Sequence, residues 1–161
     1  MPTTYLLLGS NLGNRLDLLE QARALIMSHI GVITQASGIY ETAAWGLENQ
    51  QAFLNQVLTV DTTLTPEELL QQINNLEAEL GRIRLVRWGA RVIDIDILYY
   101  DNLVLQTQRL TIPHPELQNR RFTLIPLVEI APDFVHPVLA HNNLQLLEQC
   151  ADKLPVTLLE L

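Results

Sequence analysis

The alternation of apolar and polar residues up to Leu98 predicts four strands with two helices between them. Apolar residues recur at helical spacing after Asn14 and again after Thr65. The order is therefore strand, helix, strand, strand, helix, strand, which predicts a ferredoxin-like α+β sandwich, an antiparallel sheet with helices packed on it and extra elements towards the C-terminus. The four strands are expected at Thr4–Leu8, Val32–Tyr40, Phe53–Thr62 and the end of Gly81–Leu98.

Residues that favour helix ends mark the limits of both helices. Asn14 is a good cap for the first helix, and Thr65 with Glu68 forms a capping-box signal for the second. Gly31 and Gly81 are expected to end them. The remaining predicted elements are a tight loop at Gly9–Gly13, a hairpin in which Leu103–Leu105 pairs back on the fourth strand, and helices at Leu124–Ile130 and about Leu144–Lys153.

The fourth strand carries two carboxylates. Residues two apart in a strand share a face, so Asp94 and Asp96 point one way while the alternating isoleucines point into a core. Paired carboxylates repel each other unless a cation lies between them, and Mg²⁺ prefers oxygen ligands. The pair is either a Mg²⁺ site or a solvated strand face.

Positive charge is concentrated in one quarter of an acidic chain. The formal net charge is −8, which disfavours nucleic acid and anionic membranes as partners. Seven of the ten basic residues nevertheless fall in one region, which predicts a small anionic ligand such as a phosphate. These seven are Arg82, Arg84, Arg87, Arg91, Arg109, Arg120 and Arg121.

Length and cysteine content limit the architecture and the compartment. A chain of 161 residues, 48% of them apolar, suits one domain spanning residues 1–161. Cys150 is the single cysteine, so no disulfide framework forms within the chain. A buried structural thiol and a cytoplasmic location are expected.

Two aromatic residues are candidates for holding a flat ligand. Phe53 and Asn55 share one strand face, where a ring and an amide are able to stack on a heterocycle and hydrogen-bond to its edge. A core phenylalanine beside a turn asparagine is the alternative. Phe122 adds a second aromatic next to Arg120 and Arg121.

His114 lies between two prolines, which restrict the chain to extended geometry around it. Such rigidity suits a side chain that contacts a ligand, and a purely structural histidine is the competing interpretation. The flanking arginines favour the first.

Several motifs together resemble one family. The chain is similar, over nearly its whole length, to the 6-hydroxymethyl-7,8-dihydropterin pyrophosphokinases of folate biosynthesis. The family usually has proline where this chain has Ala44, which leaves the shape of that loop open. The matching segments are Gly9–Gly13, Tyr40–Thr42, Phe53–Asn55, Arg87–Leu98, Pro113–Pro115 and Asn119–Phe122.

The resemblance implies a reaction and a set of residue roles. Pyrophosphate would move from ATP to the hydroxymethyl oxygen of the dihydropterin, releasing AMP, in a monomeric enzyme with two Mg²⁺ ions. The implied catalytic residues are Arg82, Arg91, Asp94 and Asp96, of which both aspartates also bind metal. The implied pterin contacts are Thr42, Ala43, Trp45, Phe53, Asn55 and Phe122. The implied ATP contacts are Arg84, Trp88, Arg109, Thr111, His114 and Arg120.

Two other functions fit part of this pattern. A different Mg²⁺-dependent phosphoryl or nucleotidyl transferase on the same fold would use the two aspartates without a pterin pocket. A non-catalytic ATP-sensing module would bind nucleotide without turnover.

Overall fold

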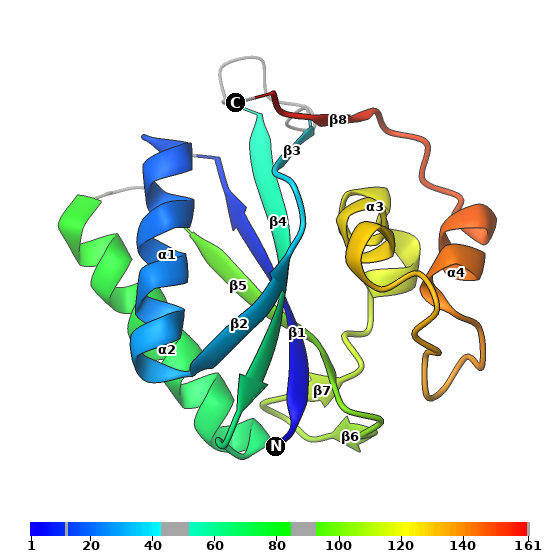
Figure 1. The fold of residues 1–161 in the computed structure, drawn as a ribbon, viewed down its shortest axis with the longest axis horizontal. Coiled ribbons are helices and arrows are strands. Elements are labelled where there is room, and N and C mark those ends of the chain that lie inside the picture. Colours follow the sequence, from blue (N-terminus) through cyan, green and yellow to red (C-terminus); the bar gives the residue numbers. More distant parts are fainter. Residues whose placement is uncertain (12, 43–51, 85–92, 161) are drawn as a thin grey trace.

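A six-stranded sheet forms the centre of the computed structural model, which describes residues 1–11, 13–42, 52–84 and 93–160 (Figure 1). The strand order is β5-β1-β4-β3-β8, and β2 also pairs with β4. The pairs β1–β4, β1–β5, β2–β4, β3–β4 and β3–β8 are antiparallel. The strands are β1 (Thr3–Ser10), β2 (Gly31–Ala36), β3 (Tyr40–Thr42), β4 (Phe53–Thr62), β5 (Asp94–Tyr100) and β8 (Val156–Leu158).

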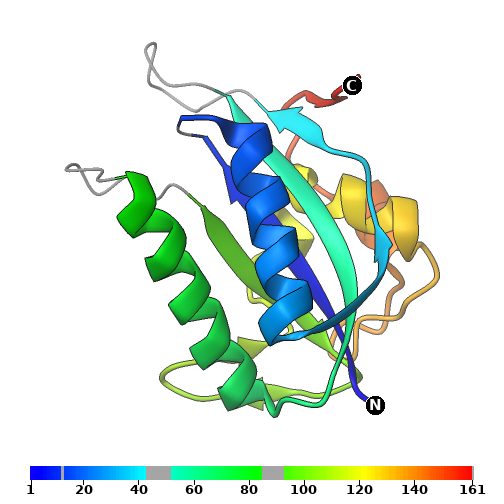
Figure 2. The same ribbon diagram turned by 60° about the vertical axis from the view of Figure 1, so that its left-hand side comes forward.

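Helices cover both faces of this sheet. The long helices α1 (Arg15–His29) and α2 (Pro66–Arg84) lie side by side on one face, as Figure 2 shows. The shorter α3 (Arg121–Ile130) and α4 (Asn143–Gln149) lie on the other face (Figure 1). The predicted α+β sandwich is confirmed, with a second helical layer supplied by the C-terminal third.

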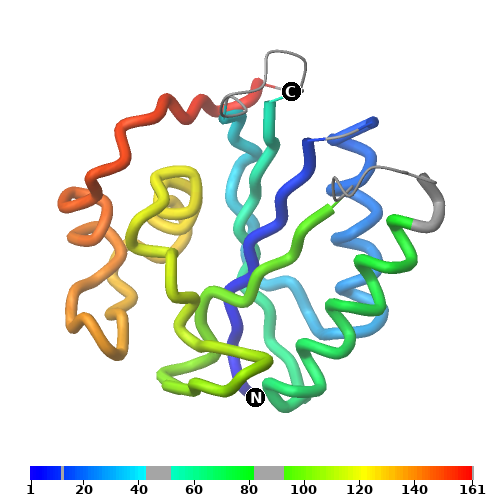
Figure 3. The backbone as a smooth tube through the Cα atoms, turned by 180° about the vertical axis from the view of Figure 1, so that it is seen from behind, coloured from blue at the N-terminus to red at the C-terminus, as the bar shows by residue number. Residues whose placement is uncertain are grey.

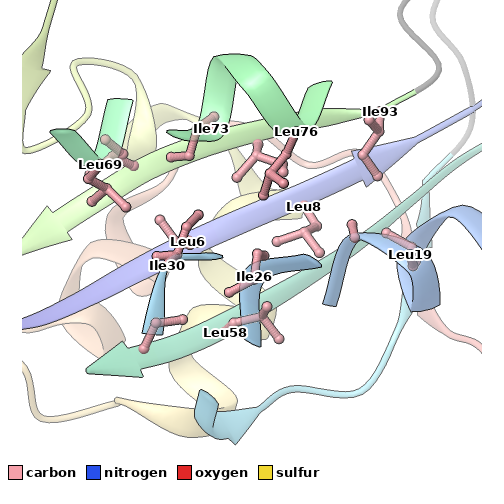
Figure 4. Close-up of a cluster of buried hydrophobic side chains, with 14 of the residues drawn as sticks. Leu6, Leu8, Leu19, Ile26, Ile30, Leu58, Leu69, Ile73, Leu76 and Ile93 are labelled. Atoms are coloured by element: carbon pink, nitrogen blue, oxygen red, sulfur yellow. The ribbon is translucent and has the colours of Figure 1, made fainter. Parts of the chain in front are cut away.

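The face under α1 and α2 is a closed apolar core. Leu6, Leu8, Ile26, Leu58 and Ile73 are each no more than 2% exposed and pack together between the sheet and the two helices (Figure 4). Burying one such side chain stabilises the fold by about 1.5–3 kcal/mol. These contacts fix β1 and β4 as the rigid base of the molecule.

A second apolar cluster lies on the opposite face, under α3 and α4. It contains Leu7, Val57, Tyr99, Leu124 and Leu127. Because β1 is buried on both faces, its sequence is a nearly continuous apolar run rather than an alternating one. This cluster fills only part of the second face.

The predicted caps are present, but two glycines do not end helices. Asn14 Oδ1 accepts from the Asp17 backbone N–H at 3.1 Å, and Thr65 and Glu68 form a reciprocal capping box. The expectation that Gly81 ends the second helix was wrong, because α2 continues to Arg84. A Cβ added at Gly81 would meet no atom within 4 Å, so this glycine occupies an open helix surface where packing of the buried stripe outweighs its poor propensity.

Gly31 begins β2 instead of ending α1. A Cβ there would lie 2.0 Å from the Asp61 carbonyl oxygen, so the close approach of two strands requires glycine. The single strand expected at Val32–Tyr40 is divided into β2 and β3, with Ser37 between them. Its hydroxyl accepts from the Val57 N–H at 3.0 Å, which replaces regular ladder pairing at the break.

Other elements also have limits or partners that differ from the prediction. β1 runs through Ser10, so part of the loop expected at Gly9–Gly13 is strand. Leu103–Leu105 does not pair back on β5; instead β6 (Leu105–Gln106) pairs with β7 (Thr111–Ile112). A 3₁₀ turn, η1 (Leu117–Asn119), precedes α3.

The last two predicted helices also have different limits. α3 begins at Arg121, before the expected Leu124, and α4 ends at Gln149, before the expected Lys153. Cys150 follows α4 directly and is buried at 4% exposure, as predicted for a structural thiol. No helix in the described part of the chain is both long and apolar enough to cross a membrane.

Candidate active site

A cavity of about 360 Å³ occupies the part of the α3 side of the sheet that the second apolar cluster leaves open. Its walls come from β1, β3, β4, β5, the start of α3 and the C-terminal segment. Seven residues predicted as ligand contacts line it: Thr42, Phe53, Asn55, Asp94, Asp96, Arg120 and Phe122. Segments far apart in sequence therefore meet at one site, as the family resemblance implied.

The strand register sets the floor of the cavity. Gly9 of β1 pairs with Asn55 on one side and with Asp94 on the other. A Cβ at Gly9 would lie 2.8 Å from Asn55 Nδ2. The missing side chain thus leaves room for the Asn55 amide to pack closely over the Gly9 backbone on the cavity floor.

Two buried polar atoms in this cavity lack a partner. Asn55 Nδ2 donates to the Leu8 carbonyl oxygen at 3.2 Å, which fixes the amide with its oxygen as a free acceptor. Asn55 Oδ1 and Thr42 Oγ1 are both buried without a hydrogen bond among the described residues. Such an atom costs about 1–3 kcal/mol unless a ligand or water satisfies it. The pair is therefore suited to a polar ligand edge.

Aromatic rings enter the cavity from two different layers. Phe53 belongs to β4 and Phe122 to the first turn of α3, and both line the space. The guanidinium carbon of Arg120 lies 5.8 Å from the centroid of the Phe122 ring, within cation–π range. A flat, partly polar ligand fits these walls.

The acidic end of the cavity contains Asp94 and Asp96, on the same face of β5 as predicted. Asp96 Oδ2 lies 4.0 Å from His114 Nε2. His114 is held by its backbone N–H, which donates to the Leu98 carbonyl oxygen at 3.0 Å, and by Nδ1, which accepts from the Glu116 N–H at 3.1 Å. This pattern places the proton of a neutral ring on Nε2, facing Asp96.

Burial lowers the pKa of His114, and the nearby Arg120 charge lowers it further, while Asp96 and Glu116 oppose the shift. The ring is thus neutral at pH 7 and able to donate from Nε2. Among the described residues, no group of three or more His, Cys, Asp and Glu side chains is arranged to hold a metal ion. Asp94 and Asp96 offer two carboxylates, and Mg²⁺ is often bound through one or two carboxylates when substrate phosphates complete its shell.

Comparison with known proteins agrees with this geometry. A family model described as 7,8-dihydro-6-hydroxymethylpterin-pyrophosphokinase (HPPK) matches residues 5–132. The chain belongs to the HPPK family. A 2-amino-4-hydroxy-6-hydroxymethyldihydropteridine pyrophosphokinase of Aquifex aeolicus is 46% identical over 138 residues, covering 86% of each chain. The Bacillus subtilis protein of the same name is 46% identical over 127 residues, 78% of this chain and 76% of that one.

Solved structures support the fold. A crystal structure of wild-type Plasmodium falciparum HPPK-DHPS superposes with a TM-score of 0.75 at 18% sequence identity and covers 92% of this chain. The match takes up 44% of that longer chain, so the present chain spans less than half of it. At this identity the likeness establishes the architecture alone.

The other residues expected in an HPPK site either lie outside the cavity lining or have side chains that the structure does not describe. Arg109 precedes β7 and Thr111 is its first residue, and neither lines the cavity. Arg82 and Arg84 lie in the last turn of α2, but the structure does not describe their side chains. Ala43, Trp45, Arg87, Trp88 and Arg91 lie outside the described residues.

Three lining residues were missed by sequence reasoning: Leu7, Gly9 and Leu154. Leu7 and Gly9 share a face of β1, so alternation places them together once the Asp94 face is known. No sequence pattern near Leu154 indicates that it reaches the cavity, because its neighbours in the chain do not predict a contact with the sheet.

Two supporting contacts at the cavity edge were also missed. Arg15 Nη1 donates to Glu41 Oε2 at 3.1 Å and to the Ala52 carbonyl oxygen at 2.7 Å. Glu41 and Ala52 directly precede Thr42 and Phe53, which pair in the β3–β4 ladder, so Arg15 holds these two cavity walls together. The second contact joins β3 to α3, because the Tyr40 hydroxyl donates to Glu129 at 2.5 Å. Burial first, then Glu129, raises the pKa of Tyr40 to about 12, so the hydroxyl keeps its proton.

Proposed function

We propose that this chain transfers the pyrophosphoryl group of ATP to the hydroxymethyl oxygen of 6-hydroxymethyl-7,8-dihydropterin and releases AMP. One observation carries the proposal: Asn55 Oδ1 and Thr42 Oγ1, buried without a hydrogen bond among the described residues, share a cavity with the paired carboxylates Asp94 and Asp96. An acceptor edge and a phosphate end thus lie in one space. Membership of the HPPK family supports the same reaction.

The acceptor half of the cavity has the chemistry to hold a pterin. The pyrimidine side of a pterin carries an amino group and ring N–H donors, which match the acceptor Asn55 Oδ1. The Thr42 hydroxyl is able to donate or accept beside it. Phe53 and Phe122 supply apolar walls for the two fused rings, and about 360 Å³ is within the range of small-molecule sites.

The carboxylate half would bind Mg²⁺ with the ATP phosphates. Asp94 and Asp96 would hold the metal, and two ions are expected from the family resemblance. When bound, Mg²⁺ neutralises phosphate charge and polarises the phosphoryl oxygens. Neutral His114, with Nε2–H directed at Asp96, is placed to orient that carboxylate and to hydrogen-bond a phosphate oxygen.

The bond changes define what the site must position. The pterin hydroxymethyl oxygen forms a bond to the β-phosphorus and loses its proton. The bond from that phosphorus to the oxygen joining the α- and β-phosphates breaks, and AMP leaves with this oxygen. Aligning the two substrates and excluding water is therefore the main task of the chain. Arg120 lines the cavity beside Phe122, and it is proposed, with Arg82 and Arg91, to engage the phosphates.

Product analysis tests the proposal. The purified chain is incubated with Mg-ATP and the hydroxymethyl dihydropterin, and nucleotides are separated by chromatography. AMP should form in equal amount to a pterin diphosphate, and omission of the pterin should abolish it. Formation of ADP, or AMP release that is independent of pterin, would show that a different transferase or a hydrolase is present. The single domain, monomeric state and cytoplasmic location stay predictions.

A further inference from the structure

The C-terminal segment Ala151–Leu159 forms part of the acceptor cavity, although it lies beyond the residues matched by the family model. Figure 3 shows this part of the chain, in red, passing from α4 to the upper end of β3. Leu154 from this segment lines the cavity with Phe122 and Thr42. The segment is therefore in position to influence how the acceptor is held.

Asp152 joins the segment to the start of α3. Its Oδ2 accepts from the backbone N–H of Arg121 at 3.1 Å, and its Oδ1 accepts from the backbone N–H of Leu154 at 3.0 Å. Arg121 is the first residue of α3, and Arg120 before it makes no side-chain cap. A carboxylate at this end satisfies a free N–H and interacts favourably with the helix dipole. One side chain thus fixes both Leu154 and the helix start.

The same segment also fixes the opposite wall. Val156 pairs with Thr42 in the β8–β3 ladder, and the Leu159 N–H donates to the Ile39 carbonyl oxygen at 2.8 Å. β3 has only three residues, so this second ladder stabilises a strand that is too short to be rigid alone. Thr42 and Phe122, from different layers, are both attached to one stretch of chain.

We propose that Asp152 is a positioning residue for the acceptor site and that Leu154 is a specificity-determining wall residue that contacts the pterin ring. Asp152 sets the distance between Leu154 and the first turn of α3, where Phe122 and Arg120 face the cavity. Asp94 and Asp96 belong to β5, which the segment does not pair with, so these two carboxylates keep their geometry. The proposal rests on the proposed function, because it assigns a role within that reaction.

Asp152→Asn is the sharpest test. The two backbone N–H groups bond to different oxygens of Asp152, and an asparagine replaces one of these oxygens with an NH₂ donor, so one N–H group would face another donor. We expect the KM for the pterin to rise about tenfold, with the Kd for α,β-methylene-ATP and Mg²⁺ changed less than twofold. Asp133→Asn is the matched control, because Asp133 is an exposed aspartate just after α3. It should leave both constants unchanged.

Leu154→Ala gives an independent test that keeps Asp152. It should raise the pterin KM several-fold, while Leu154→Met, which restores the volume, should recover most of the wild-type value. Leu144→Ala, at a position 42% exposed on α4, is the control. Thermal unfolding of each variant checks that the fold is intact.

The outcomes separate the two proposals. If the wild-type chain releases no pterin-dependent AMP, the proposed function fails. If the wild-type chain is active and both variants keep a normal pterin KM, the role of Asp152 and Leu154 is overturned. An equal loss of affinity for pterin and nucleotide would also overturn it, because that result indicates general destabilisation rather than positioning.

Discussion

The two faces of the central sheet have opposite properties at the same end of the same strands. Leu8 and Ile95 point to the α1 and α2 side, where they are buried among apolar residues. Their neighbours Gly9 and Asp94 face the other side and line the cavity. Because strand alternation separates the two faces, stability and chemistry depend on different residues that are adjacent in sequence. Substitutions on each face should therefore separate unfolding from turnover.

Asp96→Ala should produce the largest loss of activity. Removing this carboxylate takes away a proposed Mg²⁺ ligand, and metal charge stabilisation of several kcal/mol corresponds to at least about a 10³-fold loss of kcat. Its side chain is 40% exposed, so unfolding should remain cooperative with an unchanged midpoint. Single-turnover kinetics and thermal unfolding check both statements. Loss of cooperative unfolding would contradict the division between the faces.

Leu8→Ala on the closed face should lower stability while leaving the chemistry of the site unchanged. The side chain is fully buried, and truncating a buried leucine lowers the free energy of unfolding by about 2–5 kcal/mol. Below the melting temperature, the folded fraction should keep its pterin KM. Urea unfolding and steady-state kinetics at low temperature measure the two effects. A specific rise in pterin KM without destabilisation would show that the closed core contributes directly to the site.

Much of this division follows from the sequence. Period-two alternation was enough to place Asp94 opposite Ile95 and to put Phe53 beside Asn55. Short-range signals also located the caps at Asn14 and Thr65. These predictions succeeded because each depends on residues within a few positions of one another.

The remainder depends on contacts that no local pattern encodes. The role of Gly9 needs the register between three strands, and Leu154 reaches the cavity only through long-range pairing. The prediction that Gly81 ends the helix was wrong, because packing of α2 on the sheet overrides the weak helix propensity of a single glycine. Sequence reasoning therefore found the reactive side chains more readily than the residues that shape the space between them.

Gly9→Ala tests the close approach of the Asn55 amide to the Gly9 backbone on the cavity floor. The new methyl group would lie 2.8 Å from Asn55 Nδ2, so the amide must shift. Overpacking of this kind costs about 1–3 kcal/mol, and we expect the pterin KM to rise about tenfold or more. The Kd of a nucleotide analogue should change less. Unchanged pterin binding would show that the position of the Asn55 amide does not depend on the absence of a side chain at residue 9.

Thr42→Val should keep or slightly raise the stability of the fold while lowering its affinity for the pterin. Valine has the shape of threonine without the hydroxyl, and Thr42 Oγ1 is buried with no partner in the described part of the protein. Its removal should leave the free energy of unfolding unchanged or raised by up to about 1 kcal/mol, because the desolvation penalty disappears. Pterin affinity should fall by about 0.5–1.5 kcal/mol, the net value of one hydrogen bond. Calorimetric binding and urea unfolding give both values, and lower stability with unchanged affinity would indicate a structural hydroxyl.

His136 tests whether the apolar part of the α3 and α4 side is purely structural. The ring is 4% exposed, lies 5.7 Å from the Tyr99 ring centroid, and accepts at Nδ1 from the backbone N–H groups of Val138 and Leu139. Burial lowers its pKa below the ordinary value of 6.5. The unfolded chain therefore binds more protons near that pH, and stability must rise with pH. The contribution is complete above pH 6.5 and is lost as pH falls towards the folded pKa.

His136→Asn should remove this pH dependence, because the amide oxygen is able to accept from the same backbone groups without binding a proton. The His136 contribution to the free energy of unfolding should fall below pH 6.5 by up to about 1.4 kcal/mol per pH unit, the limit for one proton, so it is read as the difference in slope between the wild-type chain and the variant, both of which keep His114. Urea unfolding between pH 7.5 and about pH 5.5 measures the slope, and His141→Asn is the control. Pterin and nucleotide binding at pH 7.5 should be unchanged in the His136 variant, since the cavity lies at the other end of this face. A selective loss of pterin affinity would show that the apolar cluster and the site are coupled, and the division of this face into a structural and a chemical part would then fail.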